Sequence, residues 1–157
     1  MDRFSHLITR IDKCAEAGYA NFKRSELSLC NQPIKKMSKL TTELLNSIDY
    51  QKCLVKRNEN FHYLHSYLKD KNGFKWIEEG SLNGPMVYPF YTSSKLLRKR
   101  LIEYQIYVAG YWPNVSEWSK EDSIESKLSI DLLPLPIDHR LNENDLDKII
   151  KTIFYEY

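Results

Sequence analysis

The chain has 157 residues and a mass of 18.7 kDa, with 23 Lys and Arg against 21 Asp and Glu, so its formal net charge is +2 at pH 7. This near-balance argues against nucleic acid or an anionic membrane surface as a partner, because both are bound through an excess of positive charge. Hydrophobic residues make up 42% and aromatic residues 13%, which at this length predicts one sizeable core.

Several classes of protein are excluded by what the sequence lacks. No run of about 18 apolar residues is present, and the apolar stretch near Met1 is interrupted by charges, so neither a membrane span nor a secretory signal is expected. Three widely spaced cysteines fit neither a disulfide framework nor a zinc pattern. The five glycines form no phosphate-binding loop. We therefore expect a cytoplasmic protein.

Residues 1–37 are predicted to form a helical arm and a connector. Asp2 is a suitable N-cap for a first helix with a plausible interruption at Gly18. The apolar residues of this helix recur at intervals of three and four: Phe4, Leu7, Ile8, Ile11 and Ala15. The polar stretch 23–39 contains Pro33 and is predicted to be the connector.

Residues 38–157 are predicted to form one mixed domain that begins with two helices. Ser38 would cap a short helix, and a longer helix would start at residues 47–49 and end near Lys69, before Asn72 and Gly73. The longer helix has a stripe in steps of 4, 3, 4, 3 and 4, which places its members on one face: Tyr50, Leu54, Arg57, Phe61, Leu64 and Leu68.

Four short strands are expected after this helix, over residues 74–77, 86–91, 106–109 and 128–135. Ser93 or Ser94 would cap an intervening helix, and Asn142 or Asn144 would cap a final one. The final helix carries the clearest apolar stripe: Leu146, Ile149, Ile150, Ile153 and Phe154. These elements predict an α+β fold with α/β sandwich-like packing, in which helices cover a small sheet of three to four strands.

Arg57 is the cation on the apolar stripe, and Asn60 lies one turn further along the adjoining face. A guanidinium that faces a core must find a carboxylate, carbonyl groups or a phosphate, because an unpaired buried charge is costly. An ion pair that anchors the guanidinium is the favoured interpretation, and contact with a ligand is the alternative.

Two loops bring chemically versatile residues together. Asp138, His139 and Arg140 precede the final helix, where pairing of the acid with the arginine is favoured over a binding site. Tyr111 and Trp112, followed by a proline, form an aromatic loop that could stack on a sugar or base, cover a sheet edge or meet another domain.

No metal or catalytic motif is complete. Glu59 and His62 have the Glu-x-x-His spacing of di-iron bundles, which need two copies, and His62 with His65 lacks a third ligand at a defined spacing. Surface imidazoles are the favoured interpretation. No Gly-x-Ser-x-Gly elbow is present and no cysteine has a histidine beside it, so no catalytic residue and no metal ligand is predicted.

Several short segments, taken in their order along the chain, carry a further signal. They are Ser47-Ile48-Asp49-Tyr50 leading into Lys56-Arg57-Asn58-Glu59-Asn60, then Pro85-Met86-Val87-Tyr88-Pro89, then 101–108 before Tyr111-Trp112-Pro113, then 133–140, and Asp145-Leu146. Taken together, from about Met37 to the end, they resemble the C-terminal part of the DegT/DnrJ/StrS-type aminotransferases. These are pyridoxal-phosphate enzymes of fold type I, many of which aminate keto groups on nucleotide-linked sugars.

The resemblance implies that residues 38–157 are the small domain of such an enzyme, linked to nucleotide-sugar or surface-polysaccharide biosynthesis. The large domain with the Schiff-base lysine is absent from these residues, so we expect this chain to bind no cofactor and to be inactive alone, with pyridoxal phosphate serving the complete enzyme. The expected partners are a pyridoxal-phosphate-binding large domain, in the same or a separate chain, and a second protomer of a dimer or other homo-oligomer.

The resemblance also implies a set of substrate-binding candidates near the cleft: Arg57, Asn60, Tyr111, Trp112, His139 and Arg140. Two positions depart from the family, because Gly110-Tyr111 replaces a histidine that many members carry and Leu141 replaces a tyrosine. These departures leave the substrate class open.

The alternative is a stand-alone, non-catalytic module that binds a protein or a sugar. Such a module would expose the former interdomain face as an apolar patch. Aromatic residues could supply this patch: Tyr88, Phe90, Tyr107, Tyr111 and Trp112.

Overall fold

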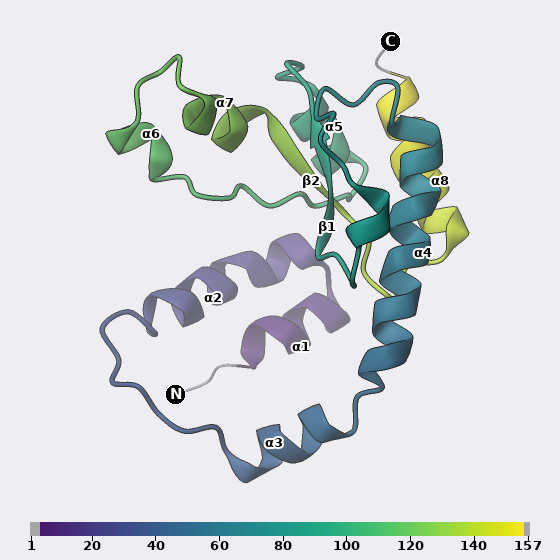
Figure 1. Cartoon of the computed structure of the whole chain (residues 1–157). Helices are drawn as coiled ribbons and strands as arrows, with labels where there is room; N and C mark the ends of the chain where they lie inside the picture. Colours follow the sequence, from purple (N-terminus) through teal and green to yellow (C-terminus); the bar gives the residue numbers. More distant parts are fainter. Residues whose placement is uncertain (1–3, 156–157) are drawn as a thin grey trace. The chain divides into compact units, whose positions relative to one another are not determined.

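The computed structural model describes residues 4–155 and divides into two units, Met1–Ile48 and Asp49–Tyr157 (Figure 1). The sequence placed the boundary after residue 37, so a short helix expected in the second domain belongs to the first unit. Each unit is described by itself below.

The first unit consists of helices α1 (Ser5–Asp12), α2 (Ala15–Leu27) and α3 (Lys39–Asn46). Lys13 and Cys14 separate α1 from α2, whereas the sequence predicts that the helical pattern is interrupted at Gly18. Gly18 instead lies buried within α2, where a Cβ atom would come within 2.7 Å of the His6 carbonyl oxygen. The missing side chain therefore allows α2 to pack closely on α1.

The ends of these helices test the predicted caps and connector. The predicted cap Asp2 lies outside the described residues. Helix α2 continues to Leu27, so the connector expected from residue 23 begins later. Ser38 caps α3 as predicted, since its hydroxyl accepts a hydrogen bond from the Thr41 N–H at 3.1 Å.

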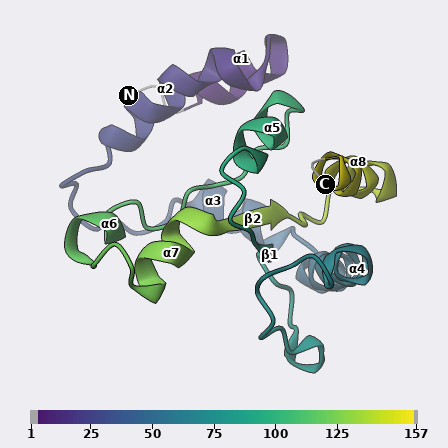
Figure 2. The same cartoon turned by 90° about the horizontal axis from the view of Figure 1, so that it is seen from above.

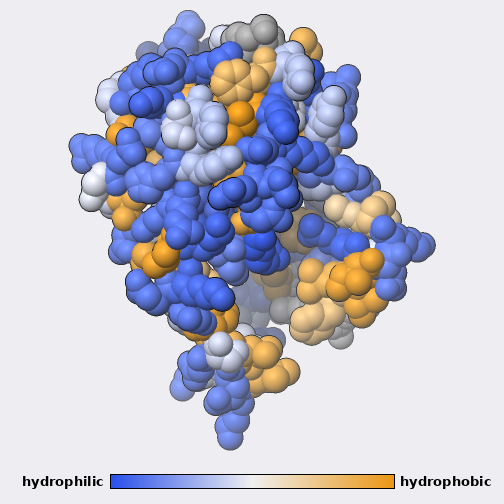
Figure 3. Space-filling model, turned by 90° about the vertical axis from the view of Figure 1, so that its right-hand side faces the viewer, coloured by the Kyte–Doolittle hydropathy of each residue, from blue (hydrophilic) through white to orange (hydrophobic). Residues whose placement is uncertain are grey.

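The first unit buries little apolar surface of its own. Gly18 is the one buried residue among those described in its helices. Large apolar side chains on α1 and α3 are exposed, including Ile11 at 84% and Leu40 at 71%, and Figure 3 shows apolar side chains at the surface of the molecule. Helices this short are marginal in water without packing of an apolar face, and residues 4–48 of this unit form no apolar core that would stabilise them.

The second unit holds the sheet and the core. Strands β1 (Val87–Tyr91) and β2 (Leu132–Pro136) pair antiparallel, with Val87 opposite Pro136 and Pro89 opposite Pro134. The other elements are α4 (Tyr50–Leu68), the 3-10 helix η1 (Glu79–Ser81), α5 (Leu97–Glu103), α6 (Val115–Trp118), α7 (Ile124–Asp131) and α8 (Glu143–Phe154).

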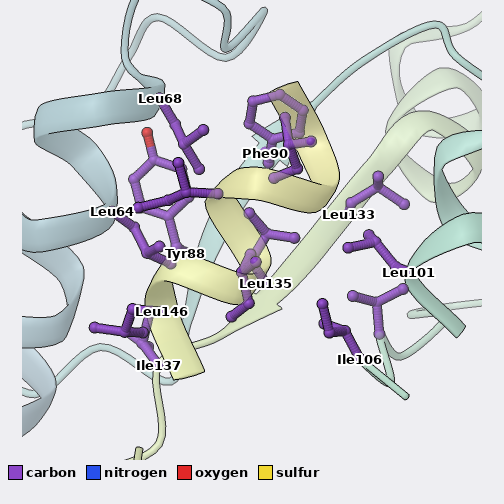
Figure 4. Packing of buried hydrophobic residues seen from close by; sticks show 14 of the residues in the cluster. Leu64, Leu68, Tyr88, Phe90, Leu101, Ile106, Leu133, Leu135, Ile137 and Leu146 are labelled. Carbon is purple, nitrogen blue, oxygen red and sulfur yellow. The ribbon is translucent and has the colours of Figure 1, made fainter. Parts of the chain in front are cut away.

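Helices α4 and α8 pack against each other beside the sheet, and α5 also contacts α8 (Figure 2). Tyr88 and Phe90 point from β1 into the core, where they meet Leu64 and Leu68 of α4 (Figure 4). The predicted stripe of α8 is buried from Leu146 to Ile153. An apolar face on each of these elements therefore accounts for one continuous core.

Polar caps fix where the two long helices begin. The Asp49 carboxylate accepts a hydrogen bond from the Lys52 N–H at the start of α4. At α8, Asn142 and Asp145 exchange side-chain-to-backbone hydrogen bonds in a capping box. The cap expected at Ser93 or Ser94 is wrong, because α5 begins at Leu97 without a side-chain cap.

The α+β class is confirmed, but the expected sheet of three to four strands is wrong, because the described residues form two strands. At 74–77, the Phe74 N–H is taken by the Asn72 side chain rather than by a neighbouring strand. At 106–109, the carbonyls of Val108 and Ala109 accept from the Arg98 guanidinium at 3.3 and 2.9 Å. Residues 128–131 are the last turn of α7.

Candidate functional site

Four of the residues singled out in the sequence meet where α4 passes the loop between β2 and α8. We call Arg57, Asn60, Asp138 and Arg140 the Asp138 cluster. Helix α4 supplies the first two residues one turn apart, and the Pro136-to-Asn142 connection supplies the other two. Residues 78 to 83 positions apart in the chain are thus held together by the packing of α4 on α8 and β1.

Arg57 lies at the edge of the core, and its guanidinium contacts two carbonyl groups and one carboxylate. Its Nη1 atom donates to the carbonyl oxygens of Pro85 at 3.1 Å and Met86 at 3.4 Å. Its Nη2 atom lies 3.8 Å from Oδ2 of Asp138, and both side chains are about three-quarters buried, with 25% and 27% exposed. The carbonyls and carboxylate that a guanidinium facing a core requires are therefore all supplied by the chain itself.

Asn60 is 1% exposed and reaches the same loop from the core side. Its Nδ2 atom donates to the carbonyl oxygens of Ile137 at 3.4 Å and Asp138 at 2.9 Å. Buried carbonyl groups without a donor are costly, so this amide fixes the path of the loop.

Asp138 is the centre of the cluster. Its Oδ1 atom accepts from the Arg140 backbone N–H at 3.0 Å and from Nε at 2.7 Å, while Oδ2 accepts from Nη2 at 3.2 Å. The fork of hydrogen bonds from Arg140 lowers the pKa of the Asp138 carboxyl to about 2. Pairing of Asp138 with Arg140, the interpretation favoured from the sequence, is confirmed.

His139 is the one predicted site residue that lines the large hollow beside α4. The hollow has a volume of about 740 Å³ and is lined by Asp49, Gln51, Lys52, Cys53, Val55, Lys56, Glu59 and His139. Its charges are mixed, since Lys56 pairs with Glu59 at 3.6 Å. His139 Nδ1 lies 3.7 Å from Oδ1 of Asp138, which links this hollow to the Asp138 cluster.

Tyr111 and Trp112 lie on the segment between α5 and α6 and are not brought to this hollow. Their rings are 5.5 Å apart, and the Trp112 indole is 63% exposed. Trp112 also has a φ of 50°, a left-handed conformation that bulky residues rarely adopt. The structure therefore separates the aromatic pair from the other predicted site residues.

The histidines of α4 contact one acidic residue rather than a metal-ligand set. His62 Nδ1 lies 3.1 Å from Glu79 Oε2, and His65 Nε2 lies 3.2 Å from Glu79 Oε1. Within residues 4–155, no group of three or more His, Cys, Asp or Glu residues could hold a metal ion. Over the same residues, no helix is long and apolar enough to cross a membrane.

The sequence predicted Asp138 as the ion-pair partner of Arg140 but not as a site residue, and it predicted Asn72 as part of a turn but not as a buried hydrogen-bonding residue. The signal for Asp138 was its spacing, since a carboxylate two residues before an arginine can accept both its backbone and side-chain donors. Asn72 is buried and donates to Tyr88 Oη at 3.3 Å and the Pro89 carbonyl at 2.7 Å, while its Oδ1 accepts from Phe74 and Tyr91 N–H groups. An Asn-Gly pair predicts a turn, but nothing local reveals these distant partners.

Comparison of the chain with protein-family models, curated proteins and solved structures finds no match.

Proposed function

We propose that residues 38–157 are the small domain of a DegT/StrS-type, pyridoxal-phosphate-dependent sugar aminotransferase, and that this chain is not catalytic alone. The convergence of the resembling segments supports the proposal. Arg57 and Asn60 of one segment hydrogen-bond to Pro85 and Met86 of the next and to the 137–138 backbone of another. Three of the segments that resemble the aminotransferases in sequence are thus joined by hydrogen bonds in the structure.

The residues of this unit do not fit the cofactor itself. A bound pyridoxal phosphate needs cations or backbone amides for its phosphate and a free lysine for its aldehyde. Arg57 and Arg140 already bind Asp138, and Lys56 pairs with Glu59. The proposed role of this chain is therefore to position a loop beside a site that a partner completes, with His139 as the side chain that faces the hollow.

The size of the native polypeptide tests this proposal. An antibody against residues 49–157 is used on extracts of the source cells, and the native protein is then purified. We expect a band much heavier than 18.7 kDa, or a co-purifying chain, with the absorbance of a pyridoxal aldimine that borohydride abolishes. A band at 18.7 kDa from a protein that carries no pyridoxal absorbance would contradict the proposal.

A stand-alone protein-binding module is the second candidate, favoured by the aromatic segment between α5 and α6. Tyr107 is 44% exposed and Trp112 is 63% exposed, so both present aromatic surface to solvent. Tyr88 and Phe90, which the sequence offered for the same patch, are 0% exposed and belong to the core. This candidate predicts the 18.7 kDa band. It also predicts that a pull-down with this chain captures a partner protein, that Trp112→Ala abolishes the capture, and that Trp118→Ala leaves it unchanged.

A further inference from the structure

A second hollow of the described residues, which we call the Trp76 groove, lies between the segment that follows α4 and helix α7. It has a volume of about 200 Å³ and is lined by Gly73, Phe74, Trp76, Tyr91, Ile124, Lys127 and Leu128. Sites for drug-sized ligands usually have about 300–1,000 Å³. The groove therefore has room for one aromatic ring with a short substituent.

The two walls of the groove are chemically different. Ile124, Lys127 and Leu128 stand at i, i+3 and i+4 on α7, so they share one face of the helix. The opposite wall is aromatic, because the rings of Phe74 and Trp76 lie 5.5 Å apart and nearly perpendicular, at 85°. An aliphatic wall facing aromatic rings is suited to a flat apolar group.

The floor of the groove is fixed before any ligand arrives. Gly73 donates its N–H to the Tyr91 carbonyl at 2.9 Å, and a Cβ atom on Gly73 would come within 2.7 Å of the Tyr91 ring. At its other end, the Tyr91 hydroxyl donates to Asp131 Oδ2 at 3.3 Å. Tyr91 is thus held through its backbone carbonyl and its hydroxyl, and the Asp131 carboxylate has a partner.

The groove also carries an available positive charge. Lys127 is exposed, and within residues 4–155 its ammonium group has no ion pair or hydrogen bond. Trp76, which lines the same groove, is 77% exposed, so most of a large apolar ring lies in water. An unpaired cation at an open aromatic slot favours a ligand with both a ring and a negative charge.

We propose that the Trp76 groove binds a small aromatic carboxylate. The ring lies between Trp76 and the apolar face of α7, where it is removed from water, and the carboxylate pairs with the Lys127 ammonium group. The groove shares no residue with the Asp138 cluster, so this inference stands apart from the proposed function.

Titration of the full chain with phenylacetate, followed by saturation-transfer NMR of the ligand, tests the inference. We expect a Kd on the order of 1 mM, because the ligand is small and the groove is open. Phenylacetamide, which lacks the charge, should bind about two- to fivefold more weakly, as expected for one exposed ion pair. Cyclohexylacetate, which lacks the aromatic ring, should also bind more weakly.

Matched variants locate the binding. Trp76→Ala should weaken phenylacetate binding about fivefold or more. Lys127→Gln should bind phenylacetate only as tightly as the unchanged chain binds phenylacetamide. Trp118→Ala and Lys120→Gln change exposed residues outside the groove and should leave binding unchanged. Thermal unfolding checks that each variant folds. No binding in the millimolar range, or equal binding by the Trp76 and Trp118 variants, would overturn the inference.

Discussion

Asn60 shows how much one buried amide contributes to the Asp138 cluster. Its Nδ2 atom supplies the hydrogen bonds to the Ile137 and Asp138 carbonyls, and its side chain is 1% exposed. Asn60 is the residue of α4 whose side chain donates to both carbonyls, so the path of the loop before α8 depends on an amide at this position.

Replacing Asn60 by Asp is therefore expected to destabilise the second unit by about 2 kcal/mol or more. The change keeps the shape of the side chain but turns a donor into an acceptor that faces two carbonyl oxygens. Urea unfolding followed by circular dichroism measures the loss. Asn144→Asp, at an exposed position of α8, is the control, and equal midpoints for the two variants would contradict the role assigned to Asn60.

Asp138 gives the cluster a pH dependence whose sign follows from its pKa. Hydrogen bonds from Arg140 hold the folded pKa at about 2, below the value of about 3.9 for a free aspartate. The unfolded chain therefore takes up this proton first as the pH falls, and the stabilisation is complete above about pH 4 and lost as the pH falls toward 2.

Arg140→Gln should raise the folded pKa of Asp138 toward the ordinary value and so flatten this part of the stability curve. NMR titration of the Asp138 carboxyl carbon measures the pKa, and acid unfolding of the variant measures the slope. Lys99→Gln, which removes an exposed pair with Glu103, should change neither. An unchanged Asp138 titration in Arg140→Gln would show that the bond from Arg140 does not set the pKa.

At the scale of elements, the packing of α1 on α2 depends on Gly18. An alanine in a helix is ordinarily more stable than a glycine by up to about 1 kcal/mol. Here the added Cβ would lie 2.7 Å from a backbone oxygen of α1, so we expect Gly18→Ala to loosen the helix pair instead, with faster amide exchange in α1. Gly80→Ala meets no atom within 4 Å and is the control; slower exchange in Gly18→Ala would refute the close approach.

Arg98 donates hydrogen bonds to backbone carbonyls of segment 106–109, which in a sheet would pair with a neighbouring strand. Its guanidinium donates to the carbonyls of Val108, Ala109 and Leu132, and burial lowers its pKa. Arg98→Lys keeps the charge but loses the fork, so amide protection of Ile106 and Val108 should fall while that of β1 is kept. Exchange rates equal to those of Arg100→Lys would contradict this role.

These elements also show what a sequence can and cannot reveal. The stripe on α8 and the caps Asn142 and Ser38 are local signals. The structure confirms both caps and the stripe from Leu146 to Ile153, whereas Phe154, the last predicted member, is 38% exposed. Residues 106–109 have the β-branched, aromatic pattern of a strand, yet a distant arginine takes their carbonyls. The Arg57–Asp138 contact likewise joins residues far apart in the chain. The sequence therefore predicted that Arg57 needs a carboxylate or carbonyl partner, but it did not identify Asp138 as that partner.

At the scale of the whole molecule, the two units differ in how much apolar surface they bury. The second unit has a continuous core, whereas the helices of the first unit bury only Gly18 among their described residues. Homo-oligomer formation, expected from the family resemblance, would cover the apolar faces of α1 and α3. It stays a prediction, and the exposed residues of these helices provide the means to test it.

Sedimentation velocity over a range of concentrations should show self-association of the full chain. Ile11→Lys and Leu40→Lys, at positions 84% and 71% exposed, should each increase the monomer fraction because a charge is costly in an apolar interface. Leu96→Lys changes a residue 72% exposed in the second unit and should leave the fraction unchanged. Identical behaviour of all three variants would exclude an interface on the first unit.

The proline pair of the sheet has a consequence for how this chain behaves when it is crowded or partly unfolded. Pro89 and Pro134 face each other across the ladder, and Pro136 ends β2. The flanking residues are the apolar, β-prone type that assembles into cross-β fibrils, but proline has no N–H to donate to an added strand. The prolines of β1 and β2 therefore act against the pairing of either strand with a second chain.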